Sequence, residues 1–346
     1  MRRLFLLMMV IALVVTPARA MELTAPEAPD SVSDIMPDNP DSFGEGFWQL
    51  LKAAIGKLKP DLAEAGRVNL SLTAAVLLIA LLNPMVGAGK KTAEFVCTVS
   101  ISLILLVPTR SMINLAVETI RQMCDYSKLL LPVMTTALAA QGGMGKSAAL
   151  YGATAAVNTA VSAVVSGLLI PMVYIYLVLS MANSAAGEDS LKKLRDFVKW
   201  LTVWALKLCL YGFTGFMGFT GVVSGSTDAA ALKATKMVIS GGVPVIGGIL
   251  SEASEAVLVS AGIAKNAAGV YGILAIVAIV LHPFLTIAVQ HLLLKLTHAV
   301  CGVFASSQAS DLIQNFSEAM GMLLAMTGTV CILFLISTVC FMKGVA

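Results

Sequence analysis

The sequence predicts an all-α polytopic membrane protein with six to eight membrane segments after a cleaved signal peptide. Of its 346 residues, 58% are hydrophobic and 12% are charged, and the mean hydropathy is +0.88. Soluble domains carry about 25% charged residues. No segment shows the alternation of apolar and polar residues that is typical of β-strands, so each long apolar run is predicted to be a helix.

The first twenty residues have the parts of a secretory signal. Arg2 and Arg3 give a basic start, residues 4–15 are apolar, and Ala18-Arg19-Ala20 forms a small-x-small cleavage pattern. This apolar core is shorter than the roughly 20 residues of a transmembrane helix. We therefore expect residues 1–20 to be a signal peptide and the mature N-terminus to lie outside the cytoplasm. Cleavage would remove three arginines and bring the formal charge from +3 to zero, which gives no reason to expect nucleic-acid binding.

Two polar regions precede the membrane domain. Residues 21–46 hold seven acids and no base, and are expected to form a flexible acidic extracytoplasmic tail. Residues 47–66 place Phe47 and Leu51 on one side of a helix and Lys52 on another, so they predict an amphipathic helix. Such a helix suits either the membrane surface or a docking partner.

Residues 67–346 are predicted to form the helical membrane domain. Spans at 70–89 and 93–109 flank the basic turn Lys90-Lys91, which the positive-inside tendency places in the cytoplasm. Residues 147–187 carry no charge and predict either one helix broken at Pro171 or two short helices. Further spans are expected to end near Tyr211 and to cover 269–289, 291–306 and 319–341, with a short linker helix that begins near Ser310.

One segment places several polar side chains on a single helical face. They are spaced by three and four residues, so opposite charges can pair along the helix. A face with four charges must meet water or partners rather than lipid. Two interpretations remain open: the helix lies at the membrane surface, or it lines an aqueous cavity or the wall of an oligomeric pore. The residues of this charged helix face are Asn114, Glu118, Arg121, Asp125 and Lys128.

Residues 224–262 combine charges with helix breakers. Ser226 or Thr227 can cap a helix that begins at Asp228, and a second helix is predicted to begin at Ser251. Between them, the glycine-rich run from Gly241 to Gly248 interrupts the helix. An interrupted backbone at membrane depth must be enclosed by protein or line a cavity. This segment is therefore predicted to be a broken helix that avoids lipid.

No pattern predicts a cofactor, a metal ion or a catalytic group. Gly145-Lys146-Ser147 matches the end of a phosphate-binding loop, but Ala140 stands where the motif needs its first glycine and no strand precedes it. The three histidines and six cysteines do not have the spacing of a metal site. The cysteines lie in apolar helical patterns and are predicted to be buried thiols.

The run from residue 221 to residue 272 resembles the core of the stage III sporulation protein AE family of endospore-forming bacteria. The residues that carry the resemblance are Ser224, Gly225, Asp228, Lys233, Lys236, Pro244 and Gly247. The resemblance implies a structural or pore-associated role for this motif. It implies a non-enzymatic, multi-pass subunit of a channel that links the mother cell to the engulfed forespore, located in the mother-cell membrane. It also implies a role in forespore development and late gene expression. The implied partners are a cytoplasmic ATPase and extracytoplasmic ring proteins.

Two hypotheses for function remain open. The first is a pore-associated, homo-oligomeric channel subunit that works by helix packing in the bilayer. The alternative is a substrate-binding permease that moves small molecules by alternating access, because discontinuous helices also bind transported substrates.

Overall fold

The computed structural model describes residues 25–37, 43–82, 90–141, 144–186, 191–216, 247–304 and 306–342. Within these ranges the ordered elements are helices and turns, with no strand. The prediction of an all-α fold is therefore confirmed for the described chain. The helices are α2 (Phe43–Leu82), α3 (Lys90–Ala140), α4 (Met144–Val164), the π-helical turn η3 (Val165–Leu169), α5 (Ile170–Ala186), α7 (Gly247–Cys301), α8 (Ser307–Met342) and a helix over residues 192–216.

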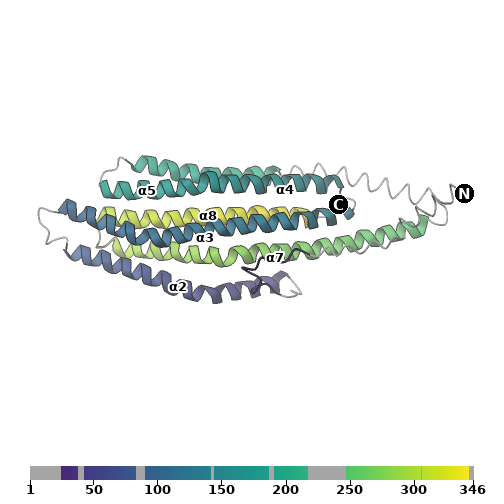
Figure 1. Cartoon of the computed structure of the whole chain (residues 1–346), viewed down its shortest axis with the longest axis horizontal. Coiled ribbons are helices and arrows are strands. Elements are labelled where there is room, and N and C mark those ends of the chain that lie inside the picture. Colours follow the sequence, from purple (N-terminus) through teal and green to yellow (C-terminus); the bar gives the residue numbers. More distant parts are fainter. Residues whose placement is uncertain are drawn as a thin grey trace.

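The helices run along one long axis (Figure 1). α2 and α7 end, and α3 and α8 begin, at the left-hand end of the view. α7 and α8 lie nearest the centre of the bundle, because 56% of the most apolar window of each is buried, against 17% for α2. Hydrogen bonds connect neighbouring helices inside the bundle, as between Thr154 and Ser337 at 2.6 Å and from Asn158 to Ser127 at 3.2 Å. Such polar contacts favour helix association in an apolar environment.

The number of membrane segments differs from the prediction. In the described part of the chain, five helical segments are long and apolar enough to cross a membrane, not six to eight. The predicted boundaries do not interrupt the helices. The amphipathic helix 47–66 continues into the first span within α2, and the spans 269–289 and 291–306 are both parts of α7. Polarity changes along these segments, but the backbone can stay helical wherever neighbouring helices supply contacts.

Pro171 widens its helix without ending it. The backbone N–H of Ile170 donates to the carbonyl oxygen of Val165, five residues earlier, which is the bond of a π-helical turn. Pro171 has no N–H of its own, so the helix must lose one bond at this point. The turn η3 allows α4 and α5 to continue as one helical segment from Ser147 to Ala186. Of the two predicted alternatives, one helix altered at Pro171 agrees better with the structure than two short helices.

The described part of the predicted acidic tail packs against the bundle. Val32 and Ile35 are buried in the core, and Lys57 of α2 forms an ion pair with Asp34 at 2.7 Å. The hydroxyl of Ser31 donates to the side-chain oxygen of Gln122 on α3 at 3.0 Å. This placement differs from the expected flexible tail, because the two apolar side chains give the acidic segment enough surface to bury. We call residues 25–37 the N-terminal strap.

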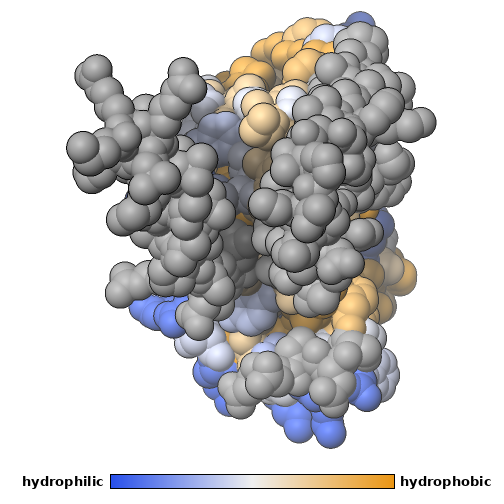
Figure 2. Space-filling view, turned by 90° about the vertical axis from the view of Figure 1, so that its right-hand side faces the viewer, coloured by the Kyte–Doolittle hydropathy of each residue, from blue (hydrophilic) through white to orange (hydrophobic). Residues whose placement is uncertain are grey.

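The two sides of the bundle differ in polarity. Seen from the right-hand end of Figure 1, hydrophilic surface gathers along the lower edge, where α2 lies, and apolar surface lies higher, toward α4 and α5 (Figure 2). Lys52, Lys57 and Lys59 of α2 are all exposed. Four cysteines, Cys97, Cys124, Cys301 and Cys331, are buried without a disulfide, as predicted.

Candidate functional site

The charged helix face lies on α3 and is exposed along its whole length. Lys128 Nζ is 2.8 Å from Asp125 Oδ1, and Arg121 Nε is 3.9 Å from Asp125 Oδ2. Asn114 and Glu118 are also exposed. Exposed pairs of this kind contribute only about 0–1 kcal/mol each. The face belongs to the 51-residue helix α3 and is not a short helix of its own. Both interpretations of this face stay predictions.

Most of the motif that carried the family resemblance lies outside the described residues. This applies to Ser224, Gly225, Asp228, Lys233, Lys236 and Pro244. Gly247 is the first residue of α7, which begins four residues before the predicted start at Ser251 and continues to Cys301. The half-helix that follows the glycine-rich run is therefore one end of a long helix.

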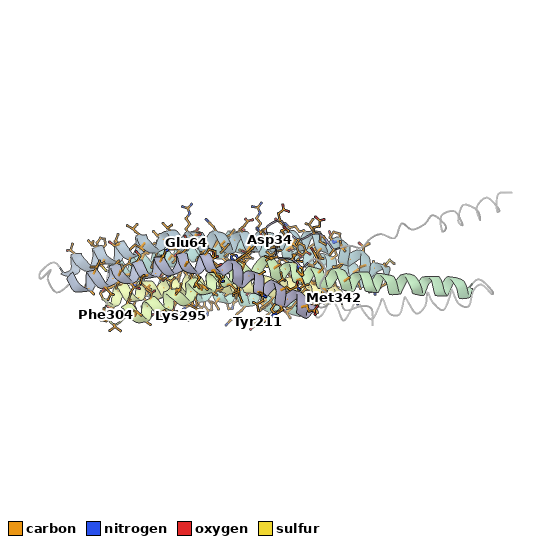
Figure 3. The ribbon with its side chains drawn as sticks, turned by 90° about the horizontal axis from the view of Figure 1, so that it is seen from below. Asp34, Glu64, Tyr211, Lys295, Phe304 and Met342 are labelled. Carbon is orange, nitrogen blue, oxygen red and sulfur yellow. The ribbon has the colours of Figure 1, made fainter. Side chains whose placement is uncertain are left out.

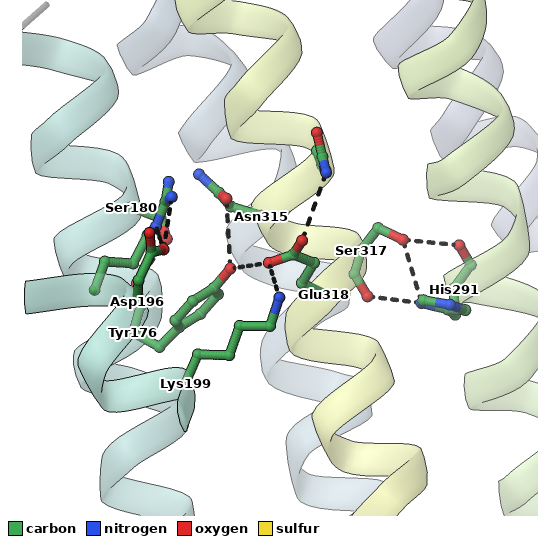
Figure 4. A network of polar contacts seen from close by, with 10 residues as sticks. Tyr176, Ser180, Asp196, Lys199, His291, Asn315, Ser317 and Glu318 are labelled. Atoms are coloured by element: carbon green, nitrogen blue, oxygen red, sulfur yellow. Dashed lines mark hydrogen bonds and ion pairs between the residues drawn. The ribbon is translucent and has the colours of Figure 1, made fainter. Parts of the chain in front are cut away.

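The structure brings together a polar network that the sequence analysis did not predict. It joins α5, the helix over residues 192–216, and α8 around the carboxylate of Glu318 (Figure 4). The hydroxyl of Tyr176, a side chain with no exposed surface, lies 2.7 Å from Glu318 Oε2. Lys199 Nζ lies 2.9 Å from the same oxygen. One carboxylate oxygen therefore accepts from a phenol and an ammonium on two different helices.

Further polar groups extend this network along α8. The Tyr176 oxygen is also 3.4 Å from Asn315 Oδ1, but its single hydroxyl hydrogen serves the shorter contact to Glu318. The amide nitrogen of Gln314 donates to Glu318 Oε1 at 3.5 Å. The amide nitrogen of Asn315 is buried and has no hydrogen-bond partner among the described residues. Arg195, whose side chain is 11% exposed, donates from Nε and Nη2 to Asp196 Oδ1 at 3.0 and 2.8 Å.

A cavity of about 610 Å³ lies beside Glu318. Its charged lining comes from two helices and consists of three basic and three acidic side chains: Lys192, Arg195, Lys199, Asp196, Asp311 and Glu318. Charged groups in membrane helices are costly unless they find partners or water, and they commonly mark functional sites. The balanced charges favour a polar molecule or the charged side chains of another protein, and they do not favour a strongly anionic ligand.

The sequence contained a weak signal for this network. On α8, Asp311, Gln314, Asn315 and Glu318 follow spacings of three and four residues, which place them on one helical face. The matching basic residues, Lys192, Arg195 and Lys199, lie at the start of the helix over residues 192–216. In the sequence they indicated only a charged beginning of a membrane span. Tyr176 lies in an uncharged segment, and nothing in its neighbours identifies it. Pairing of the two faces depends on which helices are adjacent, which the spacing does not specify.

The network contains polar and charged groups, but it does not resemble a metal site. Within the described ranges, no group of three or more His, Cys, Asp or Glu side chains could hold a metal ion. His291 Nδ1 and His298 Nδ1 lie 2.7 and 2.9 Å from the backbone oxygens of Ser317 and Ser310. These two histidines therefore connect α7 to α8.

Comparison with known proteins identifies the family. The model of the family "Stage III sporulation protein AE" matches residues 35–344. The chain belongs to this family. It is similar to the stage III sporulation protein AE of Bacillus subtilis (strain 168), with 20% identity over 301 residues, which cover 86% of this chain and 75% of the relative. No solved structure matches the chain. The family resemblance is thereby confirmed, and with it a sporulation protein whose helices are those of a membrane protein.

Proposed function

We propose that the protein is a non-enzymatic membrane subunit of the transenvelope channel that links the mother cell to the forespore. In this function it is oligomeric and pore-associated, lies in the mother-cell membrane around the engulfed forespore, and supports forespore development and late gene expression. Its partners are a cytoplasmic ATPase and extracytoplasmic ring proteins. Membership of the sporulation family supports the cellular process, and the length of the helices supports the architecture.

Helix length is the observation that carries this proposal. α7 has 55 residues and α3 has 51. At about 1.5 Å per residue, these helices are about 83 and about 77 Å long, whereas the hydrocarbon core of a bilayer is about 30 Å thick. The bundle must therefore project far beyond the lipid. Such a projection suits a subunit that meets partners in the space between two membranes.

The distribution of exposed side chains supports one position of the bilayer. Exposed apolar residues, among them Leu70 and Leu78 of α2 and Leu103 and Val107 of α3, cover the half of the bundle at which α2 ends and α3 begins. Arg67 and Arg110 mark where the exposed surface of these helices becomes charged. We place the bilayer around this half, with Lys192 and Lys193 at its cytoplasmic edge. The charged helix face and the N-terminal strap then lie in the extracytoplasmic half.

Three experiments test the channel proposal. Deletion of the gene should block spore formation after engulfment, and the native gene should restore it. Affinity purification from sporulating cells should recover the ATPase and the ring proteins, and the purified protein should form a large oligomer. A monomeric protein that purifies without either partner, or normal sporulation in its absence, would contradict the proposal.

The permease hypothesis is a second candidate, and the cavity beside Glu318 favours it. A cavity with both basic and acidic side chains, placed between two helices in the lipid-covered half, could hold a polar molecule during transport. Proteoliposomes that contain only this protein provide the test. Uptake of a zwitterionic amino acid that Glu318→Gln abolishes would favour the permease, and absence of uptake from a broad set of solutes would favour the channel subunit.

A further inference from the structure

A second cavity, of about 340 Å³, lies between α2, α3 and α7. Each of these helices has a proline near the cavity: Pro60, Pro108 and Pro283. A proline inside a helix removes one backbone hydrogen bond and bends or loosens the helix. Pro108 lines the cavity, and Pro60 and Pro283 directly adjoin the lining residues Asp61 and His282. We call it the Asp61 cavity.

The charged groups of the Asp61 cavity are acidic. Asp61 and Glu64 of α2 both line it, and no Lys or Arg is among the described residues that do so. The hydroxyl of Thr286 donates to Asp61 Oδ2 at 2.8 Å, and His282 Nε2 lies 3.3 Å from the same oxygen. Both contacts use one oxygen, so the other oxygen of Asp61 remains available. Glu64 is exposed and forms no ion pair or hydrogen bond within the described part of the chain.

Gln290 supplies independent support for a ligand. It lines the cavity from α7, is only 4% exposed, and makes no hydrogen bond to any residue that the structure describes. A buried amide without a partner is unfavourable, and such groups are rare in folded proteins. An amide that faces a cavity can be satisfied by a molecule bound there. Its carbonyl oxygen can accept a hydrogen bond from the same donor that the two carboxylates attract.

Apart from Ser111 and the polar side chains named above, the lining of the Asp61 cavity is apolar. Val68, Met112 and Leu115 contribute to it, together with Pro108. No aromatic side chain lines the cavity in the described chain, so it lacks the cage that recognises quaternary ammonium groups. An anion would find two carboxylates and no lysine or arginine in the described lining. The lining therefore matches a molecule with a hydrogen-bonding cationic group at one end and an apolar body at the other.

We propose that the Asp61 cavity binds a small organic cation that carries a primary ammonium group on an apolar body. The ammonium donates to Asp61, Glu64 and the side-chain oxygen of Gln290, while the apolar body contacts Val68, Met112 and Leu115. Thr286 and His282 hold the carboxylate of Asp61 in position. Asp34 of the strap and Glu64 are both labelled toward the same edge of the bundle in Figure 3. This site goes beyond channel assembly and does not depend on it.

The binding test uses the full-length protein in lipid nanodiscs and phenethylammonium as the probe. Isothermal titration calorimetry compares it with 2-phenylethanol, which has the same apolar body and a similar polar end without the charge. We expect phenethylammonium to bind at least tenfold more tightly. Glu64→Gln should lower its affinity about tenfold, and Gln290→Leu should lower it as well. Glu27→Gln is the matched control, because it removes the same charge from an exposed position of the strap.

Each outcome has a definite meaning. Equal affinities for the amine and the alcohol, or no binding of either, would overturn the proposal. Equal losses in Glu64→Gln and Glu27→Gln would also overturn it, because the amine would then respond only to net charge. Because Glu64 forms no hydrogen bond or ion pair within the described chain, its variant should fold, and its thermal stability verifies this. A failure of amine binding leaves the sporulation test of the channel proposal unaffected, so the two proposals can fail separately.

Discussion

The Glu318 network and the Asp61 cavity use the same kind of side chain in opposite ways. Glu318 meets an ammonium and a phenol from two other helices, and its charge is balanced inside the protein. Asp61 meets the hydroxyl of Thr286 and the imidazole of His282, whereas Glu64 lines the same cavity without a partner in the described chain. No lysine or arginine is among the described residues that line this cavity. The first arrangement stabilises the packing of helices. The second leaves carboxylates without a lysine or arginine partner in the described lining, as expected of a site that binds a cation.

The largest effect is expected from removing the carboxylate of the paired site. Glu318→Ala leaves the ammonium of Lys199 and the hydroxyl of Tyr176 without their shared partner. Because the pair is partly exposed, we expect a loss of about 2 to 3 kcal/mol in the free energy of unfolding, below the range for a fully buried pair. Reversible unfolding in mixed micelles measures it. Glu118→Ala, on the exposed face of α3, should cost less than about 0.5 kcal/mol, and equal losses would show that the network is not structural.

A smaller loss is expected where α3 and α7 touch closely. A Cβ atom added to Gly272 would lie 2.6 Å from Leu130 Cδ2, whereas one added to Gly152 would meet no atom within 4 Å. Gly272→Leu should therefore destabilise the fold by about 1 to 3 kcal/mol, and Gly152→Leu should not. The same unfolding measurement compares the two variants. If both were tolerated, α3 and α7 would be loosely packed throughout, and the Asp61 cavity would be no special opening between them.

Glu64→Gln should change stability by less than about 0.5 kcal/mol, because this carboxylate has no hydrogen bond or ion pair to lose in the described chain. This prediction separates the two acidic sites directly. A variant that binds phenethylammonium poorly but unfolds like the native protein would assign Glu64 to binding. A loss as large as that of Glu318→Ala would assign it to the fold.

The smallest effect concerns the strap and depends on pH. The hydrogen bond from Lys57 lowers the pKa of Asp34 below its ordinary value of 3.8. A lowered folded pKa means that the contact contributes fully above pH 3.8 and is lost as the pH falls through the folded value. A fluorophore on the strap should report no release between pH 7 and about pH 5 and a release below about pH 4. In Asp34→Asn, release with the same midpoint would exclude this ion pair as its cause.

Composition predicted the fold class, and local pattern predicted much less of the arrangement. The charge-free run around Pro171 identified a membrane helix, but not the π-helical turn that allows it to continue. The charged helix face was found because its residues are neighbours on one helix. Glu318 with Tyr176, and Asp61 with Gln290, were missed because each set joins helices that are distant in sequence. These contacts depend on which helices are adjacent in the bundle, and the local pattern of a single sequence does not indicate this.

The N-terminal strap has a consequence for the order of folding. Its side chains contact Gln122 and the surroundings of Leu115 on α3, residues that follow the apolar part of that helix. The strap precedes α2 in the chain, yet the surface that it borders includes residues of α2, α3 and α7 and is complete only after all three helices have packed. Burial of Val32 and Ile35 is therefore expected late in folding, after the helices that they contact have packed. Resistance of the strap to protease would report when this packing is complete.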